Sequence, residues 1–344
     1  MAKLVEQIQE YLANKYQSSV QIQDFASLSG GGGACQDNYR FDLQVEQGEL
    51  AGEHQLVLRT DKGGSLFSSL SKEQEFGVCS LAYANGVKTP RPYLLEKDTA
   101  HTGNPFFIMQ RIAGKANGRF VVKDRSLQKA RKQIVEDLAR NLAQIHTIKE
   151  SANQQNSVHA ALLRSTSSLA YAQNAVKELQ DQVKNLNEPH PAIELCLHWA
   201  EKNAPETGEL VLVHGDFRTG NFMVSPSGLD GILDWEFSHW GDPCEDIGWL
   251  CMRDWRFGKL NLEAGGLAKR EDFYQLYAEH TGKPVATEKV RFWEVIGNLR
   301  WAVGSIEQAE RHLSGVDKGI ELAAIGRRTS EMEYEAMRLV ENAV

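Results

Sequence analysis

Cysteine is scarce in this chain of 344 residues. There are five, and no two form a Cys-x-x-Cys pair. An odd, dispersed set argues against a disulfide framework and against a zinc site. We therefore expect free thiols, buried in the interior. They are Cys35, Cys79, Cys196, Cys244 and Cys251.

Long apolar runs are also missing. Hydrophobic residues make up 42% of the chain, enough for a packed interior, but no run approaches the roughly 20 residues of a membrane-spanning helix. The first twenty residues include acids and place Leu4, Val5, Ile8 and Leu12 on one helical stripe. This pattern predicts a folded helix and not a secretory signal. We expect a cytoplasmic protein without a membrane anchor.

Positive charge is in deficit. The 38 basic residues face 46 acidic ones, and the net charge of −8 is a poor match for nucleic acid. A basic run at 123–132 is interpreted as the solvated face of a helix. Internal repeats, low-complexity tails and Pro-rich linkers are absent, so we expect two lobes within one compact protein and no nucleic-acid partner. The oligomeric state is open.

The P-loop and Rossmann glycine patterns do not occur. Instead, a run of glycines separates a predicted strand at 20–28 from a second that begins near Asn38. Glycine lets backbone N–H groups approach phosphate oxygens, which makes Gly31, Gly32 and Gly33 candidates for a phosphate-covering loop. The alternative is a hairpin turn without a ligand.

The most informative stretch, 212–246, contains an Asp followed five residues later by an Asn, and a second Asp thirteen residues further on. This is the catalytic-loop spacing of kinase-like enzymes, in which Asp216 would orient the attacking hydroxyl. A hairpin predicted at 221–233 would bring Asn221 and Asp234 together at its open end. Their hard oxygen ligands suit magnesium.

Two neighbours complete this pattern. His214 precedes the Asp by two residues and is interpreted as a hydrogen-bonding anchor of the loop. Arg218 follows the Asp by two, where kinases carry a lysine that touches the transferred phosphoryl group. Each residue alone would more often be a turn or cap residue, but the combined spacing disfavours that interpretation.

A short apolar strand ends in Arg59, where kinases carry a phosphate-binding lysine. Guanidinium can still make two parallel hydrogen bonds to phosphate, although it differs from ammonium in reach. The expected partner is a Glu on the helix predicted at 71–84. Glu75 shares a face with Val78, whereas Glu73 faces elsewhere, so we choose Glu75. The alternative is a surface Glu on a solvated helix.

These residues resemble the aminoglycoside phosphotransferase and choline kinase-like family, whose pattern is His-Gly-Asp-x-x-x-x-Asn followed by an Asp strand. His-Gly-Asp-Phe-Arg-x-Gly-Asn, Leu-Asp-Trp-Glu, Gly-Asp-Pro-x-Glu-Asp and Arg-Phe-Trp-Glu-Val-x-Gly-Asn-Leu-Arg-Trp look like the branch fused to acyl-CoA dehydrogenases. The resemblance covers nearly the whole chain and is strongest from 210 to about 326. Asp-Trp-Glu replaces the Asp-Phe-Gly of protein kinases, so the metal Asp is kept and the Phe-Gly switch is absent.

The resemblance implies an α+β, bilobal, protein-kinase-like fold. Its N-terminal nucleotide-binding lobe (1–109) would hold an antiparallel sheet with a helix, and a hinge (110–114) would lead to a larger, mostly helical catalytic and substrate lobe (115–344). Helical periodicity marks stretches near 127–146, 165–185, 190–203, 269–281, 287–313 and 318–342.

By the same resemblance, the backbone carbonyl of Gln110 and the N–H of Ile112 would pair with adenine, although a plain strand end is an alternative. His146 would pack beside the catalytic loop and Asp246 would brace its backbone, both in structural roles.

The implied activity is that of an ATP- and Mg²⁺-dependent small-molecule kinase that phosphorylates a hydroxyl. Asp216 and Arg218 would be catalytic, Asn221 and Asp234 would bind the metal, and Arg59 with Glu75 would hold phosphate. The resemblance suggests a hydroxyacyl compound or its CoA thioester as acceptor. Basic side chains among tryptophans fit an anionic acceptor, unless the tryptophans are core and the arginines solvated. They are Arg253, Arg256, Arg291, Arg300, Arg311 and His312, with Trp255, Trp293 and Trp301.

Three alternatives stay open. The chain could be an aminoglycoside O-phosphotransferase, or a catalytically silent kinase-like module that only binds nucleotide. A metal-dependent hydrolase is disfavoured because neither His-x-His nor His-Glu-x-x-His occurs.

Overall fold

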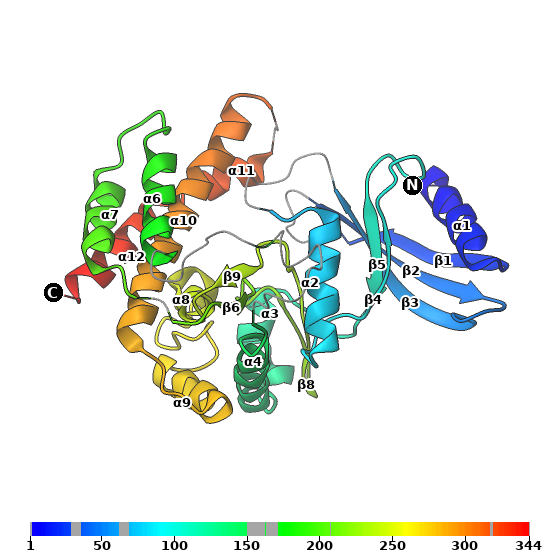
Figure 1. Ribbon diagram of the computed structural model, residues 1–344, viewed down its shortest axis with the longest axis horizontal. Helices are drawn as coiled ribbons and strands as arrows, with labels where there is room; N and C mark the ends of the chain where they lie inside the picture. The colour runs from blue at the N-terminus through cyan, green and yellow to red at the C-terminus, as the bar shows by residue number, and fades with distance from the viewer. Residues whose placement is uncertain are drawn as a thin grey trace. The chain divides into compact units, whose positions relative to one another are not determined.

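The computed structural model describes residues 2–28, 36–61, 69–149, 162, 171–206, 208–316 and 319–343. They divide into two compact units, whose elements are labelled in Figure 1. The first unit draws on Met1–Asp137, Asn153–Leu162 and Gly220–Ser238, and the second on Leu138–Ala152, Leu163–Thr219 and His239–Val344. The predicted phosphate-covering loop, Gly31, Gly32 and Gly33, lies outside the described residues.

The first unit is built on a five-stranded antiparallel sheet in the order β1-β2-β3-β5-β4. Its strands are β1 (Val20–Ser27), β2 (Gln36–Val45), β3 (Gly52–Asp61), β4 (Pro92–Glu96) and β5 (Phe106–Gln110), and its helices are α1 (Ala2–Tyr16), α2 (Lys72–Ala84), α3 (Gly118–Lys123) and the 3₁₀ turn η1 (Arg125–Leu127). The predicted sheet with helices, and with it the α+β kinase-like fold, is confirmed.

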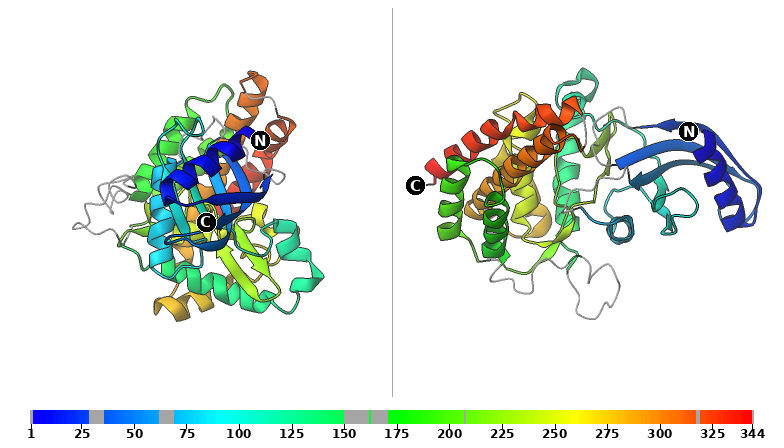
Figure 2. Two further views of the ribbon diagram at one scale, coloured as in Figure 1. Left: turned by 90° about the vertical axis from the view of Figure 1, so that its right-hand side faces the viewer. Right: turned by 90° about the horizontal axis from the view of Figure 1, so that it is seen from above.

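Alternation along β3 gives the sheet two different faces. Leu56 and Leu58 join a buried cluster with Ile8 and Leu12 of α1, and Figure 2 shows α1 lying across that face. Val57 and Arg59 point to the opposite face, where α2 packs. The amphipathic stripe predicted for the first helix is therefore the contact that covers the sheet.

A capping box sets where α2 begins. The Ser71 hydroxyl accepts a hydrogen bond from the Gln74 amide at 3.3 Å, and the Gln74 side chain accepts one from the Ser71 amide at 2.8 Å. These bonds satisfy backbone donors that the first turn leaves without helical partners. With the start fixed, the helical period turns Glu75 to the buried side together with Val78 and Ala82.

The predicted hairpin is present as β7 (Phe222–Ser225) and β8 (Gly228–Ile232). It attaches to the first unit through backbone bonds, since the Ile232 amide donates to the Lys88 carbonyl at 2.8 Å and the Lys115 amide to the Val224 carbonyl at 3.0 Å. This explains why a segment late in the chain belongs to the same compact unit as the N-terminal sheet.

The second unit is mostly helical and is organised around the long helix α10, which packs against α6, α7, α8, α11 and α12. Its elements are α4 (Arg131–Ile145, whose first residues belong to the first unit), α6 (Tyr171–Val183), α7 (Pro191–Asn203), β6 (Val211–Val213), β9 (His239–Gly241), α8 (Cys244–Cys251), η2 (Arg253–Arg256), α9 (Arg270–Thr281), α10 (Thr287–Leu313), α11 (Ile320–Gly326) and α12 (Thr329–Glu341).

The helical periodicity predicted near 318–342 is divided between two helices. They are α11 and α12, and the break follows Gly326. A Cβ on Gly326 would lie 2.4 Å from the Cβ of Ala309, so the chain passes α10 more closely than another residue permits. The Thr329 hydroxyl then donates to the Gly326 carbonyl at 2.9 Å as the next helix begins.

The two compact units are defined by how closely their residues pack. The predicted lobes (1–109 and 115–344) and hinge (110–114) are instead defined by their expected roles in nucleotide binding and catalysis. That functional division stays a prediction. Over the described ranges, no helix combines the length and the apolar character that crossing a membrane requires.

Candidate active site

The loop that contains Asp216 leaves strand β6, which pairs with β9. Gly215 has a φ of +78°, a left-handed conformation that glycine adopts without steric cost. The chain can therefore turn sharply directly before the Asp. At the other end of the loop, the Thr219 hydroxyl donates to the Gly265 carbonyl at 2.7 Å.

Asp246, at the start of α8, holds the backbone of this loop. Its carboxylate accepts hydrogen bonds from the amides of His214 at 2.8 Å and Gly215 at 2.9 Å. His146 lies 3.2 Å away through Nε2. The His214 ring in turn accepts a 3.2 Å bond from the Asp216 amide. The anchoring and bracing contacts predicted for these residues are present.

The Asp216 side chain is 6% exposed and is held by two donors on the same oxygen. Arg218 Nε and Trp249 Nε1 both reach Oδ1, at 2.8 and 2.7 Å. The Arg218 guanidinium also lies over the Trp255 ring, 4.4 Å from its centroid. Trp249 was not predicted from the sequence. Its spacing of three residues from Asp246, on one helix face, was the available signal.

In the first unit, Arg59 joins two carboxylates. Its Nε lies 2.6 Å from Glu75 Oε1, and its Nη2 pairs with Asp234. Glu75 also accepts a 2.8 Å bond from Lys72 Nζ. Although burial alone lowers the pKa of Arg59, the Glu75 and Asp234 carboxylates raise it above its usual value. The choice of Glu75 is borne out as a contact, whereas Glu73 pairs with Lys97 on the surface. Phosphate binding by Arg59 stays a prediction.

The open end of the hairpin brings the backbones of Asn221 and Leu233 together, with a 2.8 Å bond from the Leu233 amide to the Asn221 carbonyl. Asp234 follows at once with a φ of +71°, a conformation that Asp tolerates better than most residues. One amide oxygen and one carboxylate at the same strand ends form a donor set that suits Mg²⁺. Magnesium binding by Asn221 and Asp234 stays a prediction.

Glu236 is a second residue that the sequence analysis missed. Burial, together with the neighbouring Asp234 carboxylate, raises its pKa to about 7. Its carbonyl accepts a 2.7 Å bond from the Leu70 amide. The sequence signal was the Asp-x-Glu spacing, which puts two acids within two residues of each other. Across the described residues, no cluster of three or more His, Cys, Asp or Glu is placed to hold a metal.

The predicted adenine contacts lie at the end of β5. Gln110 is the last residue of the strand, and its amide donates to the Arg91 carbonyl at 2.8 Å. Ile112 lies two residues later, and a Cβ added to Gly231 would lie 2.5 Å from its Cδ1 atom. Their role with adenine stays a prediction.

The arginines considered for an anionic acceptor have partners within the second unit. Arg253 pairs with Glu335 at 2.8 Å and Arg300 with Glu245 at 3.0 Å. Arg256 donates to the Cys251 carbonyl at 2.6 Å. The remaining two reach the Asn342 carbonyl (Arg291) and the Gln308 side chain (Arg311). Much of this positive charge is used to hold the helices together.

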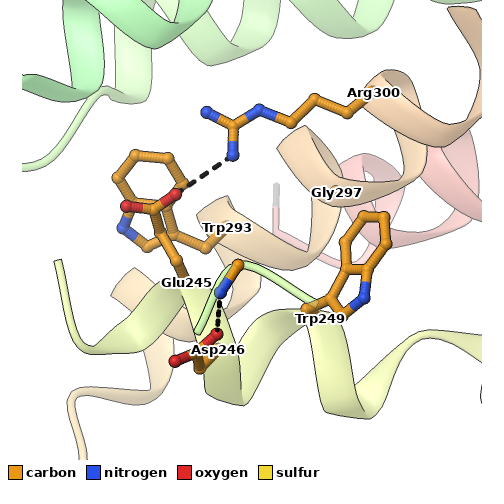
Figure 3. Close-up of a pocket in the computed structure, with 7 residues that line it drawn as sticks. Glu245, Asp246, Trp249, Trp293, Gly297 and Arg300 are labelled. Atoms are coloured by element: carbon orange, nitrogen blue, oxygen red, sulfur yellow. Dashed lines mark hydrogen bonds and ion pairs between the residues drawn. The ribbon is translucent and has the colours of Figure 1, made fainter. Parts of the chain in front are cut away.

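A small cavity lies next to the loop, between α8 and α10 (Figure 3). Its wall contains Glu245, which accepts a 2.6 Å bond from the Tyr171 hydroxyl and pairs with Arg300 and with His239. Burial alone raises the pKa of Glu245, but these partners lower it to about 2. The cavity is lined by Gly215, Glu245, Asp246, Trp249, Trp293, Gly297 and Arg300.

A family comparison matches most of the chain. The model of the phosphotransferase enzyme family covers residues 31–282, which include every residue predicted for catalysis, nucleotide binding or metal binding. Among curated proteins, mouse acyl-CoA dehydrogenase family member 10 is 26% identical over 249 residues, and the Arabidopsis thaliana protein named "Probable acyl-CoA dehydrogenase IBR3" is 26% identical over 340. These matches span 67% and 91% of this chain but only 22% and 39% of the relatives.

Solved structures share the fold. A presumed aminoglycoside phosphotransferase from Ralstonia eutropha has a TM-score of 0.69 at 21% identity, and the match covers 98% of both chains. The aminoglycoside phosphotransferase APH(4)-Ia, solved with ADP and hygromycin B, has a TM-score of 0.60 at 14% identity, over 95% of this chain and 98% of that one.

Proposed function

The chain belongs to the phosphotransferase enzyme family, and from this premise we propose that it is an ATP- and Mg²⁺-dependent small-molecule kinase. It transfers the γ-phosphoryl group to a hydroxyl of its substrate. The observation that carries the proposal is the arrangement around Arg59, which Glu75 holds in place and which pairs with Asp234. A buried cation fixed beside a carboxylate at a hairpin end suits the binding of a metal and phosphates together.

Nucleotide phosphates are bound by the first unit in this proposal. The Arg59 fork offers parallel donors to phosphate oxygens, and Gly31, Gly32 and Gly33 supply backbone N–H groups. Gln110 and Ile112 contact the adenine ring through their backbones. Structural relatives solved with ADP and with GDP support nucleotide binding.

The metal is held by Asn221 and Asp234, whose oxygen donors fit Mg²⁺. When bound, the ion neutralises charge on the phosphates. To hold the metal, Asp234 would share its carboxylate between the ion and Arg59. The Arg59 guanidinium remains anchored by Glu75 at 2.6 Å, so it stays available to phosphate.

Asp216 accepts the proton of the attacking hydroxyl and orients it for in-line transfer. An ordinary carboxylate suffices, because the proton can leave late in a loose transition state. Arg218, which is tied to Asp216 and lies over Trp255, stabilises the charge on the transferred group.

We assign the acceptor to hydroxyacyl compounds or their CoA thioesters. The support is the similarity to two acyl-CoA dehydrogenase relatives, of which this chain matches only a part. An aminoglycoside acceptor is the second candidate, supported by the fold shared with an enzyme solved with hygromycin B. We place the reaction in the cytoplasm, which suits the free, buried state of the four described cysteines.

The proposal is tested by measuring ADP release from Mg²⁺·ATP in the presence of hydroxyacyl-CoAs, free hydroxy acids and aminoglycosides. We expect strong stimulation by a hydroxyacyl acceptor. Stimulation by an aminoglycoside alone would select the second candidate. If the protein binds nucleotide but releases no ADP with any of the acceptors, it is a catalytically silent module.

Asp216→Ala provides the mechanistic arm of this test. We expect turnover to fall by roughly a hundred- to ten-thousandfold, because the proton acceptor is lost, while nucleotide affinity is largely retained. Asp181→Ala is the matched control and should keep wild-type turnover, since the exposed Asp181 side chain pairs with Lys184 on the surface. Phosphoryl transfer at the wild-type rate by Asp216→Ala would remove the assigned base.

A further inference from the structure

Two side chains of helix α8 contact the catalytic loop, one at its backbone and one at the Asp216 carboxylate. Asp246 and Trp249 are three residues apart, so they lie on one face of the helix. Asp246 accepts from the amides of His214 and Gly215, at 2.8 and 2.9 Å. One turn later, Trp249 donates its indole N–H to Asp216 Oδ1 at 2.7 Å. A single helix thus contacts three consecutive loop residues.

From this geometry we propose that Trp249 is a positioning residue, whose indole N–H orients the Asp216 carboxylate toward the acceptor hydroxyl. The inference rests on the proposed function, because it assigns Trp249 a role in the reaction that Asp216 carries out. Trp249 itself does not exchange a proton.

A carboxylate needs such a constraint. Rotation about the terminal bond of an Asp side chain is soft, so the carboxylate plane is poorly defined unless hydrogen bonds fix it. Here Arg218 Nε and Trp249 Nε1 converge on the same oxygen, one from the loop and one from α8. Arg218 sits on the same loop as the base, whereas Trp249 belongs to a helix packed against α10. Trp249 therefore ties the reacting group to a rigid element.

The neighbouring tryptophans show that an indole N–H in this region need not have an acceptor. Trp255 and Trp293 are buried, yet their Nε1 atoms have no hydrogen-bond partner. Trp249 differs because its N–H is paired with the one carboxylate assigned to catalysis. Figure 3 shows Trp249 and Trp293 as separate walls of the same cavity, which makes Trp293 a matched reference.

The kinetic test compares Trp249→Phe with Trp293→Phe. Both keep an aromatic ring in the cavity wall and remove an indole N–H. The probes are Mg²⁺·ATP with water as acceptor, and with the compound that gives the strongest ADP release. We expect Trp249→Phe to lower kcat by roughly ten- to a hundredfold, the effect of losing one hydrogen bond to a charged group, with the KM for ATP unchanged. Trp293 was considered for the acceptor site, but it is 2% exposed and packs in the core. Trp293→Phe should therefore keep a kcat near that of the wild type.

A merely structural role for Trp249 would give a different result. Equal losses of kcat in both variants, or a loss confined to KM and thermal stability, would overturn the inference. Trp249→His adds a second arm, because a shorter ring that can still donate an N–H should recover part of the kcat that Trp249→Phe loses.

The contact can also be tested without turnover. The chain has seven tryptophans, and the indole N–H resonance that disappears in Trp249→Phe identifies residue 249 in a ¹⁵N spectrum. Asp216→Asn should move that resonance further than any other indole signal. If it does not move, the inference fails whatever the activity is. If it moves while the wild type consumes no ATP with any acceptor, the proposed function fails and the orienting contact stands.

Discussion

The contribution of a charged side chain to the stability of this protein depends on how deeply the side chain is buried. Arg59 has a 10% exposed side chain and joins Glu75, which is 1% exposed, to Asp234. Arg40 pairs with Asp24 at 3.4 Å, but both side chains are about half exposed. Surface pairs contribute little because solvent screens them, whereas a buried charge that loses its partner keeps the full cost of desolvation.

We therefore expect Arg59→Met to lower the free energy of unfolding by about 3 kcal/mol, since Lys72 alone is left to pair with Glu75. Arg40→Met is the matched control and should change it by less than about 1 kcal/mol. Urea titrations at neutral pH measure both values. Equal losses would mean that burial does not distinguish the two arginines.

Glu245 carries a pH-dependent part of the stability. Its pKa is lowered from 4.5 to about 2 in the folded protein, where Tyr171, His239 and Arg300 face it. A lowered carboxyl pKa contributes stability that is complete above about pH 4.5 and is lost as the pH falls toward 2. A shift of this size corresponds to roughly 3 kcal/mol.

We expect Glu245→Gln to be less stable than the wild type at neutral pH, because Arg300 loses its ionic partner. The difference in unfolding free energy should shrink as the pH falls from about 4.5 to about 2, since Gln does not titrate. Urea titrations across this range provide the measurement. A difference that stays constant with pH would show that Glu245 does not titrate with folding.

At the scale of elements, the hairpin that carries the predicted metal ligands depends on a close backbone approach. Gly114 has a φ of +96°, and a Cβ there would lie 2.7 Å from the Val224 carbonyl oxygen. This is beside the bridge between Lys115 and Val224 that attaches β7. Gly103 has a similar φ of +88° but open space where a Cβ would be. Substitution of Gly103 therefore tests conformational strain alone, whereas substitution of Gly114 tests strain together with a steric clash.

Gly103→Ala should cost only about 1 kcal/mol, the strain of a left-handed alanine. Gly114→Ala should cost roughly 1–3 kcal/mol more, because β7 must move away from the added methyl group. Denaturant titration of both variants gives the difference. If the two losses are the same, the contact at Val224 is not tight.

At the scale of the whole molecule, ligand binding should raise the free energy of unfolding. A ligand that binds only the folded state raises the unfolding free energy by about 2.7 kcal/mol at a hundred times its Kd. Asn221 and Asp234, the proposed metal ligands, lie in the first compact unit. Nucleotide with metal should therefore stabilise that unit.

We expect Mg²⁺·ATP to raise the melting temperature more than ATP with a chelator. Asp234→Asn should remove most of that difference, because it takes away a metal ligand. Asp181→Asn, at an exposed position, should keep it. Thermal scans with and without chelator provide the measurement. A magnesium effect that survives in Asp234→Asn would place the metal on other residues.

Much of this molecule could be predicted because its signals are local. Alternation in β2 marks Phe41, Leu43 and Val45 as buried, and the structure agrees. Helical period together with the Ser71 cap selects Glu75 over Glu73. Such patterns work because a side chain's direction follows from its position within one element.

Contacts between distant elements were harder to foresee. Arg59 meets Asp234 across 175 positions in the chain, and Trp249 meets Asp216 across 33. The break after Gly326 depends on the approach of Ala309. No local pattern contains this information, since partners in space are set by how helices and strands pack.

By itself, then, the amino-acid order determined the element types, the buried faces and the catalytic-loop spacing, since each depends on neighbours within a few residues. Only the tertiary structure decided that Arg59 bridges two carboxylates, that Glu236 has a pKa near 7 and that Trp249 holds the Asp216 carboxylate. The physical reason is that burial and charge pairing depend on which surfaces pack together.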